Sequence, residues 1–70
     1  MTTPDERTRA VLHTRDFLEA LLDAEAQPGV PDEVREEARR LLRHYPDAMV
    51  LRLVNLALPQ HFASPAATPR

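Results

Sequence analysis

The 70-residue sequence contains no cysteine and has little glycine, serine or aromatic side chain. Without cysteine the chain forms neither disulfides nor thiolate metal sites. A phosphate-binding loop needs several glycines, and Gly29 is the only one. A nucleophilic site needs a serine, threonine or cysteine beside a base, but the one serine, Ser64, lies in a segment that we expect to be flexible. We therefore expect no catalytic residues, no cofactor and no enzyme activity.

Three histidines are the remaining candidates for metal binding. His13 lies near Asp16 along the chain, but two residues fall short of the three or four protein ligands that zinc takes. His44, beside Tyr45, falls at the end of a predicted helix, where a basic side chain complements the helix dipole. We expect no metal site.

The length of the chain allows one small helical domain, which we place at residues 1–59. At this size folding buries only about 60% of the surface of the unfolded chain. A single core of this size rarely supplies more than about 3–5 kcal/mol, so short natural chains lean on disulfides, a metal or a partner. With no cysteine, a partner protein or a second copy of the chain is the favoured source of further stability.

Charge and hydropathy argue against a membrane or a nucleic-acid coat as the main partner. Residues 1–6 are polar and acidic, unlike the start of a signal peptide. The longest apolar run, residues 48–58, is about half of the roughly 20 residues that cross a bilayer. The formal net charge is −2, which is unlike a protein that coats nucleic acid. We expect a cytoplasmic protein.

A first helix is predicted from about Pro4 to about Ala24. Thr3 is a favourable N-cap, Pro4 suits the first helical position, and Glu6 completes a T-x-x-E capping box. Apolar or small residues then recur at helical spacing, and they are Ala10, Val11, Thr14, Phe17, Leu18, Leu21 and Leu22. The helix is expected to turn this one wide face toward a core.

A second helix is predicted to open at Pro31, and Pro46 is expected to end it, because the residue before a proline is pushed out of the helical region. Its apolar positions are Val34, Ala38, Leu41, Leu42 and Tyr45. Acidic residues stand early and basic residues late, which matches the helix dipole. Since only a short loop around Gly29 joins the two amphipathic helices, we expect an antiparallel hairpin.

The segment Asp47–Leu58 fits either a buried strand or a helix. A helix is favoured because Arg52 and Asn55 would share one face of a helix but lie on opposite faces of a strand. A lone strand would also have nothing to pair with in this chain. Residues 60–70, rich in proline, alanine, serine and threonine, are predicted to be a flexible tail. The predicted fold class is all-α, an antiparallel helical hairpin with a short apolar third helix and a disordered C-terminal tail.

Three strings within residues 1–46 resemble a family of short proteobacterial proteins. They are PDERTRAV at Pro4–Val11, TRDFL at Thr14–Leu18 and LLRHYP at Leu41–Pro46. The family has no assigned activity, so the resemblance implies a helical protein of the cytosol and no particular chemistry. After Pro46 the members of that family are more polar than this chain.

Clustered arginines raise a nucleic-acid alternative. The charged patch consists of Arg15, Arg39, Arg40 and Arg43, whose side chains suit contacts to phosphates. In a helix-turn-helix interpretation residues 48–58 would be the recognition helix, yet nine of these eleven residues are apolar and cannot read base edges. The arginine cluster alone thus supports the alternative function, a nucleic-acid-associated accessory factor that contacts phosphates.

The apolar third helix points instead to protein–protein contact. A helix with so few polar residues must expose apolar side chains to water on its outer side. Exposed apolar patches mark interaction sites. The predicted function is a small non-catalytic protein–protein interaction module, an adaptor or regulator, that associates with itself or with another protein. The predicted interface residues are Met49, Val50, Leu53, Val54 and Leu56.

Overall fold

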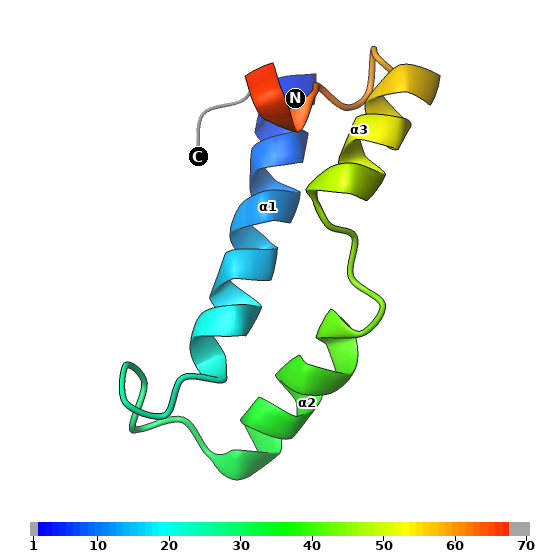
Figure 1. Cartoon of the computed structure of the whole chain (residues 1–70). Helices are drawn as coiled ribbons and strands as arrows, with labels where there is room; N and C mark the ends of the chain where they lie inside the picture. Colours follow the sequence, from blue (N-terminus) through cyan, green and yellow to red (C-terminus); the bar gives the residue numbers. More distant parts are fainter. Residues whose placement is uncertain (1, 68–70) are drawn as a thin grey trace. The chain divides into compact units, whose positions relative to one another are not determined.

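The computed structural model describes residues 2–67 as an all-α protein (Figure 1). In chain order its elements are α1 (Pro4–Leu21), α2 (Asp32–Leu42), α3 (Ala48–Ala57) and the short 3₁₀-helix η1 (Pro65–Ala67). No strand forms within these residues, so the all-α class is confirmed and α3 is a helix. In the same part of the chain, no helix is long and apolar enough to cross a bilayer.

The start of α1 has the predicted capping box. The backbone N–H of Glu6 donates to Oγ1 of Thr3 at 3.2 Å, and the backbone N–H of Thr3 donates to Oε1 of Glu6 at 2.9 Å. These reciprocal bonds satisfy donors that would otherwise lack partners at the helix start. The bond from the Thr3 backbone also holds the pKa of the Glu6 carboxyl below its ordinary value.

The end of α1 comes at Leu21, earlier than the predicted end near Ala24. Oδ1 of Asp23 accepts hydrogen bonds from the backbone N–H groups of Glu25 and Ala26, at 3.0 and 3.2 Å. A side chain that captures the backbone donors following it competes with the next helical turn. The helix therefore gives way to a turn at this aspartate.

The described residues form two compact units. The terminal unit combines residues 2–13 with residues 46–67, and the hairpin unit consists of residues 14–45. The N-terminal half of α1 belongs to the terminal unit and its C-terminal half to the hairpin unit. That residues 1–59 act as one domain stays a prediction.

The hairpin unit has the antiparallel arrangement predicted for the first two helices. Nη1 of Arg15, in α1, donates to the carbonyl of Tyr45, beyond the end of α2, at 3.0 Å. Near the loop, Arg35 of α2 donates to the carbonyls of Leu21 and Gln27, at 3.2 and 2.7 Å. The earlier part of this α1 segment thus contacts the end of the α2 segment, and the end of α1 contacts the start of α2, as an antiparallel hairpin requires.

The terminal unit is joined by side chains that donate to backbone carbonyls just before η1. Oγ1 of Thr8, a fully buried residue of α1, donates to the carbonyl of Ala63 at 2.8 Å. Nδ2 of Asn55, in α3, donates to the carbonyl of Phe62 at 2.9 Å. Both helices therefore hold the same short segment of backbone.

Residues 60–67 fall within the predicted flexible tail, and the flexibility of that tail stays a prediction. They form a turn and η1, and η1 packs against α3. Composition predicted disorder because this stretch has little apolar surface to bury. Polar donors on α1 and α3 satisfy two carbonyls of this stretch. The rest of the predicted tail, residues 68–70, lies outside the described residues.

The apolar core is small in each unit. Leu12 and Leu51 are buried in the terminal unit, and Ala38 is buried in the hairpin unit. Phe17, predicted to face a core, is 62% exposed. The other predicted core positions that are exposed are Ala10, Thr14, Val34 and Leu41. In the terminal unit, the buried Thr8 makes a long-range hydrogen bond that helical periodicity does not reveal.

Candidate interaction surface on α3

The N-terminus of α3 is fixed by Asp47. Its Oδ1 accepts a hydrogen bond from the backbone N–H of Val50 at 3.0 Å, the usual geometry of an N-cap aspartate. On the inward side of the helix, Leu51 is buried and Asn55 bonds the carbonyl of Phe62. These contacts set the rotation of α3 and thereby decide which side chains face water.

Large apolar side chains form a stripe on the solvent side of α3. Met49 and Leu53 are each 62% exposed, and Leu56 is 78% exposed. Spacings of four and three residues align them along one helical face. Val50, which is also exposed, borders the stripe. These four residues are called the α3 apolar face below.

The α3 apolar face contains four of the five predicted interface residues. The fifth, Val54, is half-buried and lies one helical turn from the buried Leu51. Leu58, just after the helix, is exposed and was not predicted. Its exposure depends on the way the chain leaves α3, which the apolar pattern alone does not indicate. That these residues contact a partner stays a prediction.

The water-facing side of α3 is more apolar than that of an ordinary surface helix, although its one charged residue, Arg52, is also exposed. An ordinary surface helix turns polar residues to water and apolar residues to the core. Here the polar Asn55 is half-buried and hydrogen-bonded, while Met49, Leu53 and Leu56 are in water. The outer face of α3 therefore offers apolar surface to another molecule.

The predicted charged patch is largely neutralised by neighbouring carboxylates. Three of its four arginines have acidic partners, in the pairs Arg15–Glu19 (3.1 Å), Arg39–Glu36 and Arg40–Glu37. The hydrogen bond from Arg40 lowers the pKa of Glu37, and the same bond raises the pKa of Arg40. With four acidic and three arginine side chains, α2 has a formal charge of −1. This surface does not favour phosphate binding.

The side chain of the fourth arginine of the patch, Arg43, has neither an ion pair nor a hydrogen bond within residues 2–67. One exposed arginine is a small fraction of the contacts by which proteins hold a nucleic-acid backbone. Among the described residues, no three histidine or acidic side chains gather closely enough to hold a metal ion.

Comparison with known proteins adds no relative. No protein-family model matches the chain, and neither the curated proteins nor the solved structures contain a match. That the chain belongs to the proteobacterial family it resembles therefore stays a prediction.

Proposed function

We propose that this protein is a small, non-catalytic, cytoplasmic protein–protein interaction module, an adaptor or regulator, which pairs with a second copy of itself through the α3 apolar face. The observation that carries the proposal is the exposure of Met49, Leu53 and Leu56 in one stripe of large apolar side chains, with Arg52 at its border. Exposed apolar stripes of this kind mark protein contacts.

The spacing of the stripe favours another helix as the partner. Apolar residues at steps of four and three form the seam through which two helices pack side by side. A second α3 presents the same spacing, so each copy would cover the apolar face of the other in a two-fold contact. The small core of each unit leaves stability to be gained from that burial.

Leu53→Glu tests the proposal. The substitution puts a carboxylate at the centre of the α3 apolar face, where pairing would bury it without a partner at a large cost. We expect the variant to sediment as a monomer and to keep its helical circular dichroism, because Leu53 contributes little to the core of its own chain.

Phe17→Glu is the matched control. Phe17 lies on α1 and has the same exposed fraction as Leu53, 62%. The control adds the same charge at an equally exposed apolar position, so it should leave self-association unchanged. If Phe17→Glu dissociates the protein and Leu53→Glu does not, the contact lies on another surface and the proposal is wrong.

A further inference from the structure

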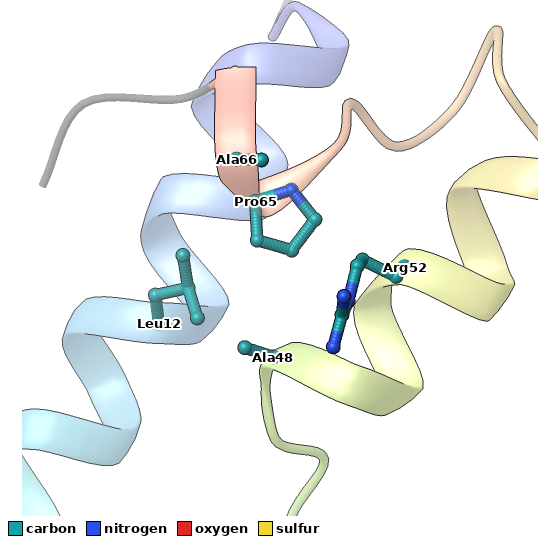
Figure 2. Close-up of a pocket in the computed structure, with 5 residues that line it drawn as sticks. All are labelled: Leu12, Ala48, Arg52, Pro65 and Ala66. Atoms are coloured by element: carbon teal, nitrogen blue, oxygen red, sulfur yellow. The ribbon is translucent and has the colours of Figure 1, made fainter.

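A pocket in the terminal unit lies between α1, α3 and η1 (Figure 2). Its volume is about 280 Å³, just below the roughly 300 Å³ at which small-molecule sites begin. Four of its lining residues are apolar, namely Leu12, Ala48, Pro65 and Ala66, and the fifth is Arg52. A pocket of this size and lining suits a small, mainly apolar ligand.

Arg52 is the cationic group of this pocket. Figure 2 shows its guanidinium projecting from α3 toward the space bounded by Leu12, Ala48 and Pro65. Within residues 2–67 this guanidinium has neither an ion pair nor a hydrogen bond. By contrast, Arg35 uses its guanidinium on two backbone carbonyls of the hairpin unit. The donors of Arg52 are therefore free for a ligand.

The chemistry of the pocket selects a monocarboxylate. A guanidinium binds a carboxylate through two parallel N–H···O bonds. The walls formed by Leu12 and Pro65 suit an apolar tail. A phosphate monoester carries a charge of about −1.5 to −2 near pH 7, more than the single positive charge of Arg52 matches, and a cationic ligand would be repelled.

We infer that this pocket binds a small monocarboxylate with a short apolar tail. The carboxylate pairs with Arg52, and the tail lies against Leu12 and Pro65. The α3 apolar face is a separate set of residues, so the inference does not rest on the proposed self-association.

Sodium hexanoate is the probe, added to ¹⁵N-labelled full-length protein and followed by amide chemical shifts. We expect saturable shifts in the millimolar range, concentrated at Leu12, Ala48, Arg52 and Ala66. Acetate has the charge without the tail, and hexanamide has the tail without the charge. Each should bind about tenfold more weakly, as expected when one of two contacts is removed.

Arg52→Gln removes the cation and should weaken hexanoate binding about tenfold, with Arg52→Lys between that variant and wild type. Arg43→Gln is the matched control, because Arg43 is also exposed and unpaired within the described residues but does not line the pocket. It should bind hexanoate as wild type does. Ala66→Leu fills the pocket from an exposed position and should abolish binding without disturbing a buried residue.

Equal affinity of wild type and Arg52→Gln for hexanoate would overturn the inference, as would equal affinity of wild type for hexanoate and acetate. Helical circular dichroism checks that each variant is folded. If Arg52→Gln is unfolded, the comparison of hexanoate with hexanamide and the Ala66→Leu variant decide instead. Repeating the titration on Leu53→Glu separates the two proposals. If this variant is a monomer and still binds hexanoate, the pocket binds its ligand independently of self-association.

Discussion

Thr8 is fully buried, and it is polar. A buried hydroxyl without a partner costs stability, whereas Oγ1 of Thr8 donates to the carbonyl of Ala63. One short bond thus joins α1 to a segment 55 residues further along the chain. At the residue scale, Thr8 and Leu12 are the two buried residues of α1 in the terminal unit.

Thr8→Val keeps the shape of the side chain and removes the hydroxyl. We expect a loss of about 1–3 kcal/mol in the free energy of unfolding, because the valine leaves the Ala63 carbonyl without its donor. Urea unfolding measures the change. Thr8→Ser keeps the donor and loses only a methyl group, so it should be less affected. A valine variant as stable as wild type would mean that the bond contributes nothing.

Glu6 gives a prediction about pH. The capping bonds from Thr3 lower the pKa of Glu6 in the folded state. The ionised carboxylate therefore contributes to the stability of the fold, and this contribution is fully present above the pKa of an unfolded glutamate. The contribution is lost as pH falls through the lowered pKa of the folded state. Glu6→Gln should therefore reduce the thermal midpoint at neutral pH and match wild type in acid. A difference between the two proteins that does not change with pH would contradict this role.

At the scale of elements, Arg35 joins α2 to the end of α1 and to the loop between the two helices. Its side chain is 16% exposed and donates to the carbonyls of Leu21 and Gln27. The carbonyl of Leu21 belongs to the last turn of α1, where helical carbonyls lack partners within the helix. Arg35 therefore serves both the end of one helix and the loop that follows it.

Arg35→Lys tests this role, because lysine keeps the charge but cannot reach two separate carbonyls with a planar fork. We expect a loss of about 1–3 kcal/mol in the free energy of unfolding. Arg39→Lys is the control: its pair with Glu36 is exposed, and such pairs contribute about 0–1 kcal/mol. Equal effects of the two substitutions on urea unfolding would show that Arg35 is an ordinary surface residue.

The helices, the antiparallel hairpin and the capping box were predictable from sequence, whereas the end of α1 and the contacts of residues 60–67 were not. The capping box of Thr3 and Glu6 lies within four residues and was correctly predicted. Residues 60–67 accept hydrogen bonds from Thr8 and Asn55, which lie far away in the sequence or on another element, so no local pattern predicts these contacts. On α3, apolar composition predicted an exposed face, but only the rotation of the helix shows that Val54 turns away from it.

At the scale of the whole molecule, little apolar surface is buried and a stripe of it is exposed. Pairing through the α3 apolar face links folding to association, so stability should depend on concentration. We expect the thermal midpoint of wild type to rise with protein concentration, and that of Leu53→Glu to stay constant. Differential scanning calorimetry over a dilution series measures both. A wild-type midpoint independent of concentration would argue against coupled folding and association.

The mass of the wild-type protein in solution tests the proposed pairing most directly. Sedimentation equilibrium over a concentration series should give twice the 7.9 kDa of one chain at the upper end and should approach the mass of one chain on dilution. The mass of a single chain at every concentration would contradict the pairing of two α3 apolar faces.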